Sequence, residues 1–258
     1  MKIGLMLTST CNFQCRHCMV DSTLDKNLAD DKVISRFYEI VRYNKPETVC
    51  ILGGEPLLFV DKVEEIVSNL SRVCNDFLIY SNGSFLLDET KRKRVSDLGV
   101  QVRISKTDFH KDFWTDEIEQ LINESPYWKI EALNKDIKIF PRGRALTNRV
   151  YQNQSCPCSL VGEVYHGRWH SDRFLVMQDG SVNIWCPCMS LELANVFTDS
   201  IVTHDLLVER EALLREFLQD LDMLYDDMLF MCNEVCIHFK VTKEGIFRDG
   251  ELLEEFNN

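Results

Sequence analysis

The sequence predicts an α/β protein, in which a partial (β/α) barrel of the TIM type is followed by a small cysteine-rich α+β domain. Short apolar runs alternate with amphipathic helical patterns through the first half, and this alternation stops near residue 141. Six of the 11 cysteines fall beyond that point. Such alternation predicts parallel strands with helices outside them. We therefore divide the chain into a barrel domain, residues 1–145, and a second domain, residues 146–258.

The expected strands of the barrel are short apolar runs, and the expected helices carry apolar residues on one face. The strands are expected at Ile3–Leu7, Thr48–Leu52, Phe77–Tyr80, Val100–Ser105, Trp128–Leu133 and Ile137–Phe140. The helices are expected at Asp31–Tyr43, Asp61–Val73, Asp88–Leu98 and Phe113–Asn123. These units are too few for a closed eight-fold barrel. In such barrels the chemistry lies at the C-terminal ends of the strands.

The second half of the chain has another pattern, which predicts a hairpin and one long helix. Gln178-Asp179-Gly180 separates the apolar runs Phe174–Met177 and Ser181–Trp185, as is typical of a hairpin. The acidic stretch Asp205–Met231 carries one apolar stripe at helical spacing. We interpret that stripe as core packing.

Composition and charge narrow the class of protein. With 45% hydrophobic and 27% charged residues, the 258-residue chain can bury a core. Its formal net charge of −12 disfavours nucleic acid as a partner, because phosphates would be repelled. We see no apolar run of 18 residues and no signal peptide, so we expect a cytoplasmic protein without membrane association. An odd number of cysteines then favours metal or iron–sulfur ligation over disulfides.

Three cysteines directly follow the first expected strand, in the pattern Cys11-x-x-x-Cys15-x-x-Cys18. Thiolates are the usual ligands of iron–sulfur clusters. A closed structural site needs four ligands, so three leave one iron open for an exchangeable ligand. Zinc is the alternative, but its fourth ligand would have to be His17, which is adjacent to Cys18 and poorly placed to share its metal.

A second motif, Gly53-Gly54-Glu55-Pro56, ends the second expected strand. With both motifs, the sequence resembles the radical S-adenosylmethionine (SAM) superfamily over residues 3–145. The resemblance implies a catalytic [4Fe–4S] cluster on Cys11, Cys15 and Cys18, whose open iron binds the amino and carboxylate groups of SAM. It also implies SAM contacts from residues near the strand ends, namely Gly53, Gly54, Glu55, Asn82 and Ser105.

The resemblance further implies an oxidoreductase-type enzyme. The reduced cluster would cleave SAM to methionine and a 5′-deoxyadenosyl radical, which abstracts a hydrogen from the substrate. A reductant of the flavodoxin or ferredoxin type would supply the electron. Asp108 and His110, just past the fourth expected strand, are candidates for substrate binding or proton transfer; a hydrogen-bonded loop pair is the alternative. Arg142 and Arg144 are either carboxylate ligands or surface residues.

The remaining cysteines lie in the second domain, where the sequence resembles the twitch and SPASM domains of the same superfamily. Cys186 follows the expected hairpin, as a cysteine does in those domains. The resemblance implies one auxiliary [4Fe–4S] cluster, with one ligand from each Cys-Pro-Cys pair and two from the last cysteines. Structural zinc on four of the six is the alternative. The six are Cys156, Cys158, Cys186, Cys188, Cys232 and Cys236.

Three hypotheses for the function follow. The first is an enzyme that modifies a ribosomally synthesised precursor peptide, because most twitch- or SPASM-bearing relatives act on peptides. The second is a small-molecule dehydrogenase of the aminocyclitol type, favoured by the short chain and by the spacing of the last three ligand positions. The third is a non-catalytic, metal-stabilised binding protein, which the intact Gly-Gly-Glu-Pro motif disfavours.

Overall fold

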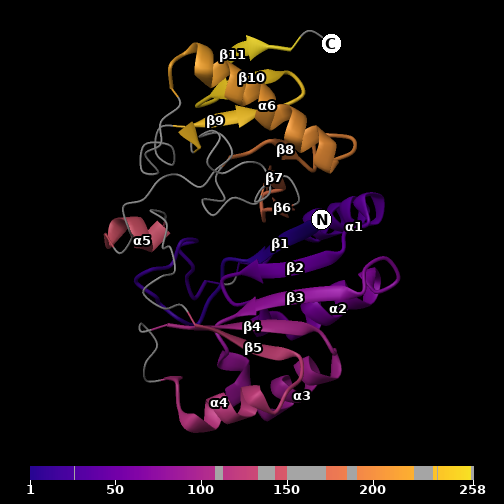
Figure 1. Cartoon of the computed structure of the whole chain (residues 1–258), viewed down its shortest axis with the longest axis vertical. Helices are drawn as coiled ribbons and strands as arrows, with labels where there is room; N and C mark the ends of the chain where they lie inside the picture. Colours follow the sequence, from indigo (N-terminus) through magenta and orange to yellow (C-terminus); the bar gives the residue numbers. More distant parts are fainter. Residues whose placement is uncertain are drawn as a thin grey trace.

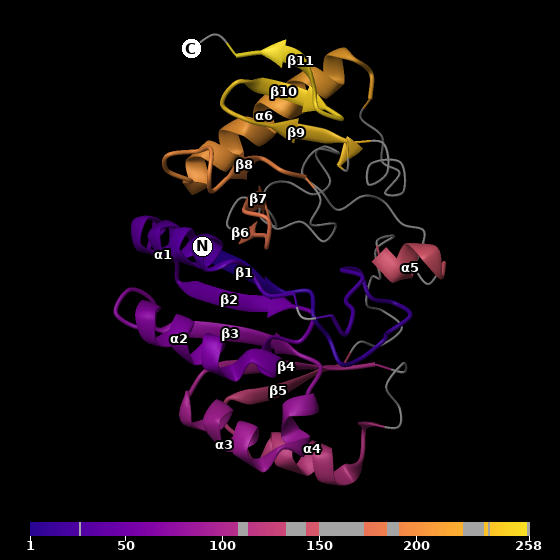
Figure 2. The ribbon, with the colours of Figure 1, turned by 180° about the vertical axis from the view of Figure 1, so that it is seen from behind.

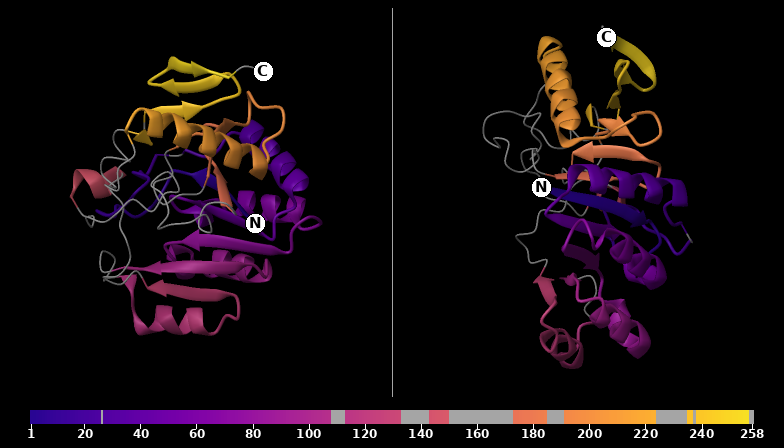
Figure 3. Two further views of the ribbon diagram at one scale, coloured as in Figure 1. Left: turned by 45° about the horizontal axis from the view of Figure 1, so that its top comes forward. Right: turned by 90° about the vertical axis from the view of Figure 1, so that its right-hand side faces the viewer.

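The computed structural model describes residues 1–25, 27–107, 113–132, 143–149, 173–184, 191–223, 235–236 and 238–256. Its first half is a parallel sheet with helices packed on one face (Figures 1 and 3). The strands are β1 (Lys2–Thr8), β2 (Thr48–Gly53), β3 (Asp76–Ser81), β4 (Gln101–Lys106) and β5 (Trp128–Ala132). The helices are α1 (Asp31–Asn44), α2 (Val60–Leu70), α3 (Glu89–Asp97) and α4 (Asp116–Asn123), with 3₁₀ turns η1 (Pro56–Phe59) and η2 (Ser84–Leu87).

The second half adds strands to this sheet and forms a smaller one. An eight-stranded sheet has the order β5-β4-β3-β2-β1-β6-β7-β8, and a three-stranded sheet has the order β11-β10-β9. The strands are β6 (Arg173–Val176), β7 (Ser181–Ile184), β8 (Ala194–Asn195), β9 (Phe239–Val241), β10 (Gly245–Arg248) and β11 (Glu251–Glu255). The helices are α5 (Gly143–Thr147) and α6 (His204–Asp220).

One strand of the second half lies directly beside the first strand of the chain. β6 pairs with β1 in parallel, and β7 returns antiparallel to β6, as the hairpin signal predicted. The mixed α/β fold with a parallel sheet is therefore confirmed, and this sheet continues past residue 145. The domain boundary itself stays a prediction.

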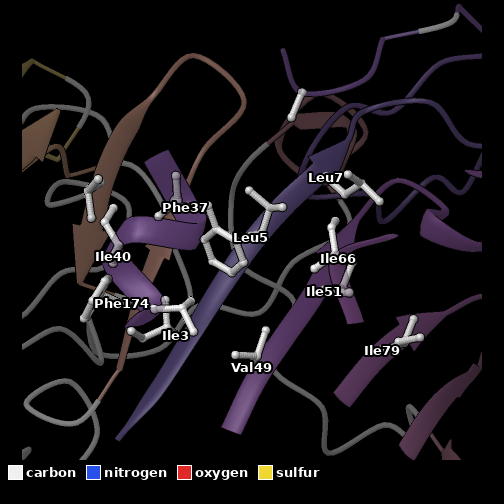
Figure 4. Packing of buried hydrophobic residues seen from close by; sticks show 14 of the residues in the cluster. Ile3, Leu5, Leu7, Phe37, Ile40, Val49, Ile51, Ile66, Ile79 and Phe174 are labelled. Atoms are coloured by element: carbon white, nitrogen blue, oxygen red, sulfur yellow. The ribbon is translucent and has the colours of Figure 1, made fainter. Parts of the chain in front are cut away.

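The main core lies between the sheet and its helices. Every second residue of the central strands points to the helix side, where the side chains pack against α1 and α2 (Figure 4). Ile3, Leu5 and Leu7 of β1 are fully buried there, against Phe37 of α1. The opposite face of the sheet, which we call the inner face, carries a smaller apolar cluster. That cluster consists of Met6, Cys50, Leu52, Leu78 and Leu175.

The structure corrects the ends of three predicted helices. Helix α2 ends at Leu70 rather than at residue 73. Helix α4 begins at Asp116, not at residue 113, because the Thr115 hydroxyl accepts a hydrogen bond from the Ile118 N–H and so caps the first turn. Helix α6 ends at Asp220, and Asp222 then has a positive φ of 53°, which stops the helix. The strand predicted over 137–140 lies outside the described residues.

Among the helices that the structure describes, none combines the length and apolarity that a membrane crossing requires.

Candidate cluster and cofactor site

The three N-terminal cysteines lie on a loop, residues 11–23, that leaves β1 and returns beside it. We call it the cluster loop. Its two ends are joined by backbone hydrogen bonds. Cys11 N–H donates to the Thr23 carbonyl at 2.7 Å, and Thr23 N–H donates to the Ser9 carbonyl at 3.2 Å. Within it Cys11 is buried, whereas Cys15 and Cys18 are half-buried. The sequence therefore brings these thiols to the C-terminal edge of the sheet, as predicted.

Hydrogen-bond donors face two of the sulfur atoms. Phe13 N–H lies 3.4 Å from Cys11 Sγ, and Ser22 N–H lies 3.5 Å from Cys18 Sγ. Asn82 Nδ2, from the end of β3, lies 3.6 Å from Cys11 Sγ. Donors of this kind stabilise thiolates and help to set the potential of iron–sulfur clusters.

The electrostatics of the loop fit a cationic cluster core. Burial, together with the charges on Cys11 and Cys18, raises the pKa of Cys15 to about 12. Burial likewise raises the pKa of Cys11. Three thiolates this close repel one another unless iron neutralises them. Within the described residues no three His, Cys, Asp or Glu side chains are placed to hold a single metal ion; a four-iron cluster is wider, and each thiolate binds a different iron.

The two glycines of the second motif are required by contact with the chain that leads into the cluster loop. Gly54 N–H donates to the Thr8 carbonyl at 2.6 Å. A Cβ atom on Gly53 would lie 2.1 Å from Thr8 O, and one on Gly54 would lie 2.2 Å from Thr10 O. Gly53 also has a φ of +139°, which disfavours other residues. The end of β2 is thus packed directly on the start of the cluster loop.

Glu55 joins the ends of β2 and β3 from a fully buried position. Its Oε1 accepts from Leu57 N–H and from the Ser81 hydroxyl, each at 3.0 Å, and its Oε2 accepts from Asn82 N–H at 2.6 Å. Burial nevertheless raises the pKa of Glu55 to about 7. The carboxyl oxygens are therefore used internally, and the expected contact of Glu55 with SAM stays a prediction.

Asn82 connects this buried carboxyl to the cluster loop. Its backbone is held by Glu55, while its side chain donates to Asn12 Oδ1 at 2.9 Å and approaches Cys11. Its Oδ1 accepts from Ser84 N–H at 2.8 Å, which fixes the amide orientation. The structure thus brings Asn82 and the Gly-Gly-Glu motif together around Cys11. The role of Asn82 in SAM binding is untested and stays a prediction.

Strand register places a group of polar side chains on the inner face that sequence reasoning missed. Tyr80 of β3 lies beside Arg103 of β4, and Ser105 lies beside Glu131 of β5. Ser105, the predicted SAM residue, therefore shares its face with Arg103 and Tyr80. Alternation within each strand indicates on which face of the sheet a side chain lies, but only the register shows which side chains are neighbours. The candidates Asp108 and His110 lie outside the described residues.

The second cysteine group is described at one position. Cys236 is buried, next to Val235 and just before β9. The other five, Cys156, Cys158, Cys186, Cys188 and Cys232, lie outside the described residues. The auxiliary cluster and its ligands therefore stay a prediction.

The chain belongs to the radical SAM superfamily, because residues 5–138, more than half of its length, match that family. Members of this superfamily are enzymes that use a [4Fe–4S] cluster and SAM. A protein of Methanocaldococcus jannaschii, whose name proposes that it activates a glycyl-radical enzyme, is 26% identical over 102 residues. This match covers 38% of each chain, so the chain corresponds to less than half of that relative.

Solved structures share the fold over most of the chain. BtrN in an open conformation matches with a TM-score of 0.54 and 16% identity, covering 92% of this chain and 90% of that one. The protein anSMEcpe, solved with bound AdoMet and a Kp18Cys peptide, matches with a TM-score of 0.52 and 14% identity. That match covers 82% of each chain. At these identities the likeness concerns the fold.

Glu55 gives a pH-dependent prediction. The unfolded chain releases the Glu55 proton near pH 4.5, whereas the folded chain keeps it to about pH 7. Between these values the folded state binds more protons, so the contribution of Glu55 to the free energy of unfolding falls as the pH rises, by ~3 kcal/mol in all. Gln does not titrate. The free energy of unfolding of the wild type minus that of Glu55→Gln should therefore fall from pH 4.5 to about pH 7.

Chemical unfolding of the cluster-free proteins at several pH values measures this difference, with the exposed Glu89→Gln as the baseline. A difference that stays constant from pH 4.5 to 7 would contradict the raised pKa.

The Gln variant should also bind SAM more weakly while keeping its iron, because Asn82 loses part of its anchor. The loss of one charge-assisted hydrogen bond is worth about 1.5–3 kcal/mol.

Proposed function

We propose that Cys11, Cys15 and Cys18 hold the catalytic cluster of a peptide-modifying radical SAM enzyme. The observation that supports this most strongly is the junction of three elements at one sheet edge. Thr8 and Thr10, which lead into the cluster loop, pack on the Gly53-Gly54 backbone. Asn82 reaches from the next strand to Cys11. Three features would thus meet in one place. They are the three thiolates, the backbone proposed to bind SAM, and the Asn82 amide that donates to a thiolate.

When bound, the reduced cluster supplies the electron that splits SAM into methionine and a 5′-deoxyadenosyl radical. The protein's own residues orient SAM and the substrate and keep water away. Gly53 and Gly54 allow the backbone to approach closely, and Glu55 holds this loop against Asn82. Ser105 faces the inner side of the sheet, where a polar SAM group can meet it. The apolar cluster around Met6 and Leu52 would shield the reacting carbon.

A peptide substrate is favoured by one structural relative. The anSMEcpe structure holds a Kp18Cys peptide together with AdoMet, and it shares the fold of this chain over 82% of both. On the inner face Arg103, Lys129 and Glu131 offer charged groups that can bind polar peptide atoms. The second candidate, a small-molecule dehydrogenase of the aminocyclitol type, rests on the spacing of the last three ligand positions expected in the second cysteine group.

An anaerobic assay with SAM, a reductant and candidate substrates separates these two functions. Precursor peptides encoded beside the gene are compared with aminocyclitols, and 5′-deoxyadenosine and product masses are measured. We expect a peptide to raise 5′-deoxyadenosine formation above the substrate-free rate and to change in mass. Stimulation by aminocyclitols alone would favour the dehydrogenase. The variant with Cys11, Cys15 and Cys18 changed to Ala is the blank.

A further inference from the structure

A short helix from the middle of the chain lies on the cluster loop (Figure 2). In helix α5, the Ala145 N–H donates a hydrogen bond to the Cys18 carbonyl at 3.1 Å. Gly143 at its start has a φ of +50°, and a Cβ there would lie 2.8 Å from the same carbonyl oxygen. Just after the helix, Asn148 Nδ2 donates to Arg16 O at 3.0 Å. The Ala145 contact joins backbone to backbone, and the Asn148 side chain ties the loop a second time.

One side chain of this helix spans the loop on both sides of Cys18. Arg144 Nε donates to the Cys15 carbonyl at 3.1 Å, and its Nη1 donates to the Ser22 carbonyl. The same Nη1 pairs with Asp21 Oδ1 at 3.3 Å. The side chain of Arg144 is only 23% exposed. A planar guanidinium can hold two separate carbonyls at once, which an ammonium on a flexible stem cannot do with the same geometry.

We propose that Arg144 is a positioning residue for the catalytic cluster: its guanidinium clamps the Cys15 and Ser22 carbonyls and so fixes where the thiols of Cys15 and Cys18 point. This rests on the proposed ligand role of the three cysteines. The clamp acts on the backbone, so it shapes the loop whether or not iron is bound. It replaces the sequence-based expectation that Arg144 binds a carboxylate of SAM or substrate or is a surface residue.

The charge of Arg144 has a second, separable effect. Its positive charge lies next to the Cys15 backbone and, in the loaded enzyme, would favour the more negative, reduced cluster. Nη2 of Arg144 is buried and has no hydrogen-bond partner in the described part of the chain. Geometry and charge can be separated by comparing Arg144→Ala with Arg144→Lys.

The test measures iron loss to a chelator and the midpoint potential of the cluster in anaerobically reconstituted full-length protein. Arg144→Ala should lose iron at least about tenfold faster, because the loss of even one of its two charge-assisted hydrogen bonds is worth about that factor. Its midpoint potential should shift to more negative values, because a nearby positive charge is gone. Arg144→Lys should also lose iron faster, while its potential stays close to that of the wild type. The exposed Arg72→Ala, at the opposite end of the strands, should change neither.

Two results would overturn the clamp. Wild-type iron retention and potential in Arg144→Ala would show that the contacts have no effect on the cluster. Full iron retention in Arg144→Lys would show that charge alone is enough, without the two-carbonyl geometry. If the Ala variant does not fold, as judged by circular dichroism, the Lys variant carries the test. A wild-type protein that binds no cluster would instead refute the proposed ligand set, so the two failures can be told apart.

Discussion

Changing Cys11, Cys15 and Cys18 together to Ala is expected to remove about four irons per chain and to abolish SAM cleavage. The groups that face the sulfur atoms of Cys11 and Cys18 in the loop, the N–H groups of Phe13 and Ser22, cannot replace the thiolates as ligands. An amide N–H stabilises a thiolate but cannot bind iron. The loop itself should keep its course, since its ties to Thr23 and Arg144 use backbone atoms and not the thiols.

The control for this prediction removes another cysteine of the same half. Cys74 donates to the Glu47 carbonyl at 3.3 Å, away from the cluster loop. The Cys74→Ala variant should keep its iron and its SAM cleavage. Iron analysis and quantification of 5′-deoxyadenosine measure both effects. Undiminished cleavage in the triple variant would place the cluster elsewhere.

Changing Cys232 and Cys236 to Ala is expected to remove a second set of about four irons while SAM cleavage partly survives. An iron–sulfur reading of the second cysteine group predicts about eight irons in the wild type and about four after the N-terminal triple change. Zinc at the second cysteine group predicts stoichiometric zinc and no more than about four irons in the wild type. It predicts nearly no iron after the triple change. Metal analysis of the three proteins decides between them.

The same double change should destabilise the C-terminal part, because metal binding there would also be folding energy. Cys236 is buried in the core with Val235 and Phe239, so part of any loss is packing. Val235→Ala is the matched control, since it removes packing without removing a ligand. A double variant that keeps all of its iron would contradict the auxiliary cluster.

The parallel half of the fold could be predicted because its signals are local. Strands β1 to β3 are largely buried runs, and helix α1 presents a regular apolar face. The cluster motif could be placed because it directly follows a strand whose C-terminal end belongs to the active edge of such a sheet. The Gly53-Gly54 pair was recognised by resemblance, and the structure supplies its physical reason, the close approach to Thr8 and Thr10.

The rest depends on contacts between distant residues, which periodicity does not encode. Nothing in the local sequence shows that β6 pairs with β1. The register places Arg173 beside Lys2, although more than 160 residues separate them in the chain. The clamp joins Arg144 to Cys15 across 129 residues, and the buried bond from Asn82 to Glu55 spans 27. The short strands β9 to β11 carry weak alternation and were not predicted.

The measurement that tests the central claim most directly is SAM cleavage by the anaerobically reconstituted, reduced wild-type chain. Methionine and 5′-deoxyadenosine are quantified beside the triple Cys11, Cys15, Cys18 to Ala variant. If the cluster loop holds the catalytic cluster, the wild type should form both products in equal amounts and the variant should form neither. Equal cleavage by both proteins, or no cleavage by a wild type that carries its iron, would contradict this assignment.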